Sequence, residues 1–111
     1  MSKTVIINSE VLGSGDEELG RQLIGSFLRK LWGNSVRPSR IIFYNAGVKL
    51  LVEGSPVLDA LDGLSEQGVD LIACGTCVTF YDIKEKIAVG RVSNMNEIVS
   101  MMMSDAAVVT V

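Results

Sequence analysis

The sequence predicts an α/β fold, a three-layer α/β/α sandwich with helices on both faces of a mostly parallel sheet. Three observations support this prediction. Short runs of β-branched and other apolar residues alternate with longer segments whose apolar residues recur at helical spacing, which is typical of parallel βαβ units. Hydrophobic residues make up 48% of the chain, enough to form a buried core. No internal repeat, linker or low-complexity tract interrupts the pattern, so we expect residues 1–111 to form a single domain.

The first half of the chain predicts a strand, a helix and a second strand. Residues 4–8 form a β-branched apolar run of strand length. Ser14 or Asp16 is placed to cap the N-terminus of a helix that Gly33 ends. The apolar face of this helix is formed by Leu19, Leu23, Ile24, Phe27, Leu28, Leu31 and Trp32. We expect residues 40–44 to form the second strand.

The second half repeats the pattern, first clearly and then more weakly. Residues 48–52 fit either a helical turn or an extended segment. Pro56 begins a helix that Gly68 ends, and residues 69–73 form the third strand with Cys74 at its carboxyl end. Beyond this point the sequence indicates a short helix over 78–81, a turn over 83–87, a brief extended piece over 90–92, a further helix and a last strand over 106–111.

The last helix begins at Asn94 and Glu97, a pair that resembles a capping box. Its inward face is expected to hold Met95, Ile98, Val99 and Met102. Successive helical residues lie about 100° apart, so Met101 and Met103 are expected to point away from this face. They either stay exposed or fill a subunit interface. We favour the interface, because so small a domain has few helices with which to cover its sheet.

Composition and charge exclude several classes of function. The net charge is -3, the pI is near 4.8 and the basic residues are scattered, so we expect neither a nucleic acid nor an anionic membrane as partner. No apolar stretch has the length of a signal-peptide core or a membrane helix, which predicts a soluble, cytoplasmic protein. The chain contains no histidine, the commonest general base and metal ligand, and we expect neither a metal nor a cofactor.

Three loops are expected to share one edge of the sheet. Ligands of open α/β sheets bind beyond the carboxyl ends of the strands. The loops that follow the first three strands are Gly13-Ser14-Gly15-Asp16, Asn45-Ala46-Gly47 and Cys74-Gly75-Thr76-Cys77. The candidate binding residues are Gly13, Ser14, Gly15, Asn45, Gly75 and Thr76. The first loop is placed to cradle an anion at a helix start, but it matches no nucleotide-binding motif, and a tight turn explains it more simply.

Cys74 and Cys77 are the candidate catalytic residues. A cysteine at a strand end, followed by the start of a helix, lies among backbone N–H groups that favour the nucleophilic thiolate. Gly75 allows the backbone to approach a sulfur ligand closely, and Thr76 offers it a hydrogen bond. We interpret Cys74 as an accessible thiol that accepts sulfane sulfur as a persulfide. Cys77 would then resolve the persulfide, assist the transfer or only pack.

Other interpretations of the two cysteines stay open. Both can be small buried hydrophobes. A Cys-x-x-Cys pair can also form the reversible disulfide of a thioredoxin-like redox protein, although the helix after this pair looks short for that class. Zinc requires four ligands, so two thiolates would need a second chain to complete a site. An oligomeric module that binds a small anion or a protein without any turnover is the remaining alternative.

Several segments of the sequence resemble one known family. They are Leu12–Gly20, Leu71–Cys77 followed by Phe80-Tyr81, and Val89–Val99. Together they extend over nearly the whole chain and are similar to the carboxyl-terminal domain of YedF-type proteins. These proteins belong to the DsrE/DsrF-like superfamily of sulfur-relay proteins and are commonly labelled sulfurtransferase-like selenium metabolism proteins.

The resemblance implies a DsrE/YchN-like fold with a five-stranded sheet, homo-oligomers from dimers to hexamers, and a TusA-like sulfur-carrier protein as partner. It places the sulfur-accepting cysteine at Cys74 and implies a link to selenium metabolism. Whether the chain acts as a sulfurtransferase-like enzyme stays open. The sequence departs from the family pattern in two ways. Tyr81-Asp82 stands where the DsrE pattern has Arg-Gly, which removes a positive charge near the persulfide, and we expect no TusA-like domain of the kind that longer YedF-type proteins carry.

Overall fold

The structure of the chain, a computed structural model, describes residues 3–104 and 107–111. Its strands are β1 (Lys3–Ile7), β2 (Arg40–Phe43), β3 (Asp70–Cys74), β4 (Arg91–Ser93) and β5 (Ala107–Thr110). Its helices are α1 (Glu17–Gly33), η1 (Asn45–Leu51), α2 (Leu58–Glu66), α3 (Gly75–Phe80), η2 (Lys84–Lys86) and α4 (Met95–Ser104), where η marks a 3-10 helix. The expected order of elements is confirmed, although α3 begins at Gly75 rather than at Val78. Ala106, the predicted start of the last strand, lies outside the described residues.

All neighbouring strands of the sheet run parallel, in the order β4-β3-β2-β1-β5. The predicted five-stranded, mostly parallel sheet is therefore confirmed. Parallel pairing places the carboxyl ends of all strands along one edge of the sheet. Because β1, β2 and β3 are adjacent, the loops that follow them meet at that edge, where ligands of such folds bind.

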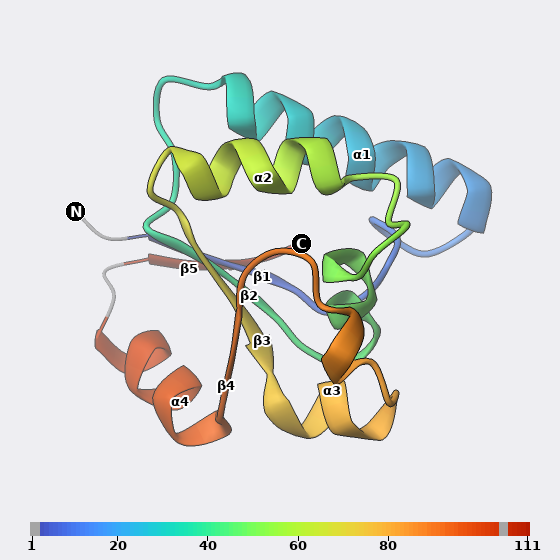
Figure 1. Cartoon of the computed structure of the whole chain (residues 1–111). Helices are drawn as coiled ribbons and strands as arrows, with labels where there is room; N and C mark the ends of the chain where they lie inside the picture. The colour runs from blue at the N-terminus through green and yellow to red at the C-terminus, as the bar shows by residue number, and fades with distance from the viewer. Residues whose placement is uncertain (1–2, 105–106) are drawn as a thin grey trace.

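Helices cover both faces of the sheet (Figure 1). The helices α1 and α2 lie on one face, and α4 lies on the other. Side chains alternate between the two faces along each strand. In β3, Leu71 and Ala73 pack on the α1 and α2 side, whereas Ile72 and Cys74 pack on the α4 side. Within the described residues no helix combines the length and the apolar character that crossing a membrane requires.

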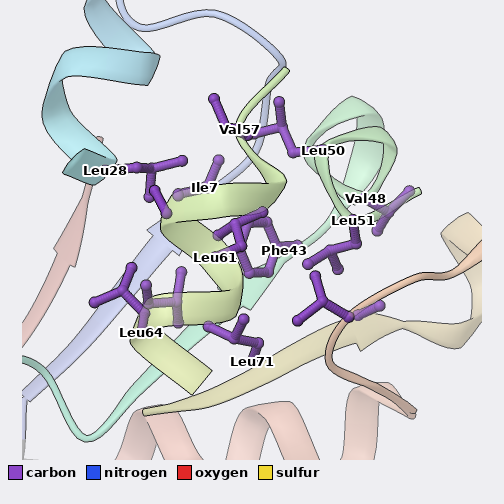
Figure 2. Close-up of a cluster of buried hydrophobic side chains, with 14 of the residues drawn as sticks. Ile7, Leu28, Phe43, Val48, Leu50, Leu51, Val57, Leu61, Leu64 and Leu71 are labelled. Carbon is purple, nitrogen blue, oxygen red and sulfur yellow. The ribbon is translucent and has the colours of Figure 1, made fainter. Parts of the chain in front are cut away.

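The larger of the two cores lies between the sheet and the α1, α2 and η1 layer (Figure 2). Phe43 of β2 packs there with Leu28, Leu61 and Leu64, and all four side chains are fully buried. Burial of a side chain of this size contributes about 1.5–3 kcal/mol to stability. The smaller core on the opposite face consists of Ile6, Ile42, Ile72, Cys74 and Ile98.

Two helices begin at the caps that the sequence predicts. The Asp16 carboxylate accepts a hydrogen bond from the Leu19 N–H at 2.9 Å, which selects Asp16 over Ser14 as the cap of α1. The Asn94 side chain accepts from the Glu97 N–H at 2.9 Å and caps α4. The Glu97 carboxylate, however, accepts hydrogen bonds from Arg91 and from the Ser93 hydroxyl. Glu97 therefore ties the start of α4 to β4.

The segment after β2 forms the 3-10 helix η1, which settles the ambiguity over residues 48–52. Val48, Leu50 and Leu51 of this helix are buried in the larger core. Gly47 allows the helix to lie directly on the end of β1, because a Cβ atom at this position would stand 2.2 Å from the Ile7 carbonyl oxygen. This close approach fixes the position of Asn45, the first residue of η1.

The burial of the methionines at positions 101–103 differs from the expectation. Met101 and Met102 are both half-buried and pack on the smaller core, whereas Met103 is 78% exposed. The prediction that Met101 points away from the core is therefore wrong. The placement of Met95 and Val99 on the inward face is wrong as well, because both side chains are exposed. A helical face that packs on a flat sheet is wide enough to take two successive residues.

We predict that Gly47→Ala destabilises the protein by about 1–3 kcal/mol, because the added methyl group would meet backbone that cannot rotate away. Urea unfolding measures the effect. Gly33→Ala is the matched control, since open space surrounds that position, and it should leave stability unchanged or raise it by up to about 1 kcal/mol. Equal stabilities for the two variants would contradict the proposed contact between η1 and β1.

Candidate functional site

Cys74 is the last residue of β3, and its side chain points into the smaller core. The residue is 1% exposed and belongs to the same cluster as Ile72 and Ile98. The strand alternation explains this burial, because Cys74 stands two residues after Ile72 and therefore shares its face of the sheet. The expectation that the Cys74 thiol is accessible is thus wrong for the single chain.

Cys77 lies in α3 and is the more exposed of the two cysteines. Its side chain is half-buried and contacts both cores at the carboxyl edge of the sheet. The backbone N–H of Asn45 donates a hydrogen bond to Cys77 Sγ with an N···S distance of 3.0 Å. The Cys74 and Cys77 side chains are neighbours that both belong to the smaller core, and both cysteines are free thiols. The structure therefore joins one buried thiol to one partly open thiol.

The surroundings of Cys77 act on its ionisation in opposite directions. Burial raises the pKa of the Cys77 thiol above that of an ordinary cysteine, the Asn45 N–H opposes this shift, and the neighbouring Cys74 side chain raises the pKa further. Cys77 is consequently protonated for most of the time at neutral pH. The Asn45 N–H is the contact that stabilises the thiolate once it forms.

Asn45 is the candidate binding residue that the structure brings directly to the cysteines. It has a φ of 50°, a left-handed conformation that residues other than glycine seldom adopt. Its side-chain oxygen accepts a hydrogen bond from the Tyr81 hydroxyl at 2.9 Å. The Lys49 ammonium lies over the Tyr81 ring, 4.3 Å from the ring centroid. A positive charge thus reaches this region from η1, although the family's arginine position holds Tyr81.

Sequence reasoning missed Tyr81 and Lys49 as parts of this site. Tyr81 lies 36 residues from Asn45 along the chain, so no local pattern links the two. One weak sequence signal pointed to a tight turn beside Tyr81, because Asp82 stands at the glycine position of the family pattern. In the structure Asp82 has a φ of 55°, a left-handed conformation that aspartate tolerates.

Gly75 and Thr76 connect the two cysteines. A Cβ atom at Gly75 would stand 2.7 Å from the Ser93 carbonyl oxygen, so this glycine allows α3 to begin against the end of β4. Thr76 is exposed on α3. The close approach that Gly75 permits is to the protein's own backbone.

The Gly13, Ser14 and Gly15 loop forms a separate hollow. This hollow is lined by Val11, Gly13, Ser14, Gly15, Asp16 and Glu17, and it includes neither cysteine. Two carboxylates border it, and Asp16 already accepts from the N-terminal N–H of Leu19. The negative charge of these carboxylates disfavours the binding of an anion in this hollow. Gly13 and Gly15 both have positive φ angles, 80° and 139°, which agrees with a tight turn.

Among the described residues, no third metal ligand joins the two cysteines. Within residues 3–104 and 107–111, no group of three or more His, Cys, Asp or Glu side chains gathers as a metal site would require. Cys74 and Cys77 supply two sulfur atoms between them.

The profile of the DsrE/DsrF-like family matches residues 1–111, the whole chain. The chain belongs to the DsrE/DsrF-like family. No curated protein sequence matches it. The ychN protein from E. coli has a similar structure, with a TM-score of 0.70, 19% sequence identity and complete coverage of both chains.

Two solved structures of proteins of unknown function are also similar to this DsrE/DsrF-like chain. MTH1491 from Methanobacterium thermoautotrophicum has a TM-score of 0.71 at 20% identity, and the match covers 100% of both chains. BT1422 from Bacteroides thetaiotaomicron has a TM-score of 0.70 at 14% identity, with 99% of this chain and 95% of that one covered. At these identities the similarity establishes the shared fold.

We predict that a small alkylating reagent modifies Cys77 of the native chain first and that Cys74 reacts at least about tenfold more slowly, because Cys74 reacts only when the smaller core opens. The rate at Cys77 should rise with pH and reach half its maximum above the pKa of an ordinary cysteine, since the protonated thiol is favoured. Peptide mass spectrometry measures each site separately. Equal rates at the two cysteines would show that the smaller core does not protect Cys74.

Proposed function

We propose that this chain is a sulfur-relay protein, sulfurtransferase-like in its chemistry, in which Cys74 and Cys77 together carry sulfane sulfur as a persulfide. The family is linked to sulfur relay. The observation that supports the proposal most strongly is the contact between a buried and a partly open free thiol at the carboxyl edge of the sheet. Such a pair can receive sulfur from outside and hold it away from water.

The burial of Cys74 suggests an order for the two steps. Cys77 thiolate attacks the terminal sulfur of a donor persulfide, so that a new S–S bond forms on Cys77, the donor's S–S bond breaks and the donor leaves as a thiolate. Cys74 then attacks the same terminal sulfur on Cys77. Cys74 becomes the persulfide, the Cys77 sulfur leaves as a thiolate and then takes up the proton that Cys74 released, and no oxidant is needed. Cys77 is thus the entry thiol, and Cys74 is the acceptor that stores the sulfur.

Sulfur loading tests this order. After incubation with a small persulfide donor, the intact mass of the wild-type chain should increase by one sulfur atom, and fragmentation should place that atom on Cys74. Cys74→Ser should still gain the sulfur, now on Cys77, and should lose it faster to added thiols because the site is more open. Cys77→Ser should load at least about tenfold more slowly, because only core opening exposes Cys74.

The outcomes of this experiment separate the candidate functions. Normal loading of Cys77→Ser would show that donors reach Cys74 directly. An unchanged wild-type mass with several donors would contradict sulfur relay and favour a binding module without turnover. A mass lower by two hydrogen atoms, with both thiols lost together, would indicate a Cys74–Cys77 disulfide and a redox function. A parallel incubation with a selenium donor tests the link to selenium metabolism, and a TusA-like carrier is the proposed protein partner.

We also propose that the chain forms a homo-oligomer through α4 and β5. The exposed apolar side chains on this side of the sheet are Met95, Val99 and Met103 of α4 and Val108 of β5. Val108 lies on the α4 side because its register partner Thr4 stands two residues before Ile6, which packs on the smaller core. Apolar surface of this extent is disfavoured on a monomer, and β5 is an edge strand of the sheet. An assembly at this face would also cover the helix that encloses Cys74.

We predict that Met103→Lys shifts the protein from oligomer to monomer, because an ammonium group would be buried without a partner in the interface. Sedimentation at micromolar concentration measures the mass of the assembly. Val36→Lys is the matched control, since Val36 is 66% exposed but lies outside α4 and β5. A monomeric wild type, or equal effects of the two substitutions, would contradict an interface at this face.

A further inference from the structure

Asn45 holds a left-handed backbone conformation that sets the direction of its N–H group. Its φ of 50° is in the left-handed region, where a Cβ atom crowds the following carbonyl group. As the first residue of η1, its N–H has no partner inside that helix. The conformation directs this free N–H at Cys77 Sγ, with an N···S distance of 3.0 Å.

The side chain of Asn45 is held by the same helix that carries Cys77. The Tyr81 hydroxyl donates to Asn45 Oδ1 at 2.9 Å. Tyr81 lies one helical turn after Cys77, and its own N–H donates to the Cys77 carbonyl at 3.0 Å. The end of α3 therefore contacts Asn45 at two points, once through the thiol and once through the phenol.

The Tyr81 ring is itself fixed in orientation. The Lys49 ammonium lies 4.3 Å from its centroid, and the Phe80 ring meets it edge to face with centroids 5.2 Å apart. Both contacts are made by the ring and not by the hydroxyl. Tyr81→Phe would therefore remove the bond to Asn45 and keep the packing of the ring.

We propose that Tyr81 is a positioning residue for the entry thiol: by holding the Asn45 side chain, its hydroxyl keeps the Asn45 N–H aimed at Cys77 Sγ. The bond stabilises the Cys77 thiolate before attack on a donor, and it again stabilises the same sulfur when it leaves as a thiolate in the transfer to Cys74. The proposal rests on the proposed function in that it gives Cys77 the role of entry thiol.

The pH dependence of thiol reactivity tests this role. A hydrogen bond to a thiolate lowers the pKa of the thiol, so Tyr81→Phe should raise the pKa of Cys77 by about one unit. Nucleophilicity rises with pKa by a Brønsted coefficient of about 0.4–0.5, so exchange of Cys77 with a small neutral disulfide should be about three- to fourfold slower at neutral pH but about threefold faster above both pKa values. The two rate profiles should cross.

A crossing distinguishes positioning from simple damage to the fold. A variant that only loosens the structure would show a change of rate in the same direction at all pH values, and that result would overturn the proposal. An unchanged profile would overturn it as well. Tyr44→Phe is the matched control, because it removes the hydroxyl of the other tyrosine next to Asn45 in the sequence, and its profile should coincide with that of the wild type.

A double-mutant cycle tests whether Tyr81 acts through the Asn45 side chain. Asn45→Gly removes the amide but allows the left-handed backbone. It should raise the pKa of Cys77 to a similar extent, and adding Tyr81→Phe to it should have no further effect. Additive shifts would show that Tyr81 acts by another route.

The experiment separates this proposal from the proposed function. Thiol exchange is measured without any sulfur donor, so crossing profiles with no sulfur loading would support the role of Tyr81 and reject sulfur relay. Normal sulfur loading together with coincident rate profiles would support sulfur relay and reject the role of Tyr81. If both hold, Tyr81→Phe should load sulfur about three- to fourfold more slowly than the wild type at neutral pH and recover at high pH.

Discussion

The two-residue period of β3 determines how the cysteine pair is arranged. Because Cys74 completes the strand, its side chain must lie on the same face as Ile72, and α4 covers that face. The next three residues turn into α3 and bring Cys77 to the edge of the sheet, in contact with both cores. One strand residue more or fewer would exchange the faces. The division into a buried and a partly open thiol therefore follows from strand geometry.

The buried thiol and the edge thiol suit different chemical tasks. A persulfide on Cys74 would lie among Ile72, Ile98 and the half-buried methionines of α4, where water and competing thiols have little access. Cys77 has the access that a donor needs, but burial and its neighbour hold its thiol in the protonated form. The Asn45 N–H, free because it begins η1, offsets part of this cost. In the proposed relay, Cys74 would protect the sulfur and Cys77 would react with the donor.

The elements around the pair are held by close packing and by a few polar contacts. Gly47 lets η1 rest on the end of β1, and Gly75 lets α3 begin against β4. Arg91 of β4 binds Asp70 at 2.9 Å and Glu97 at 3.0 Å, which joins β3, β4 and α4. Each exposed ion pair of this kind stabilises only weakly. Together they join β3, β4 and α4, the elements that surround Cys74.

The sequence by itself determined the order of strands and helices, the parallel sheet and the placement of the Cys-x-x-Cys segment at its carboxyl edge, because these follow from local periodicity and from turn residues. The alternation of side chains along β3 also predicts that Cys74 is buried, but only if Cys74 is known to be the last residue of the strand. The structure supplies that fact, because α3 begins at Gly75, directly after the strand. The tertiary structure alone decided that Asn45 meets Cys77 and that Tyr81 meets Asn45. Those contacts join residues 32 and 36 positions apart, and they depend on how η1 and α3 pack at the edge of the sheet, which no local pattern encodes.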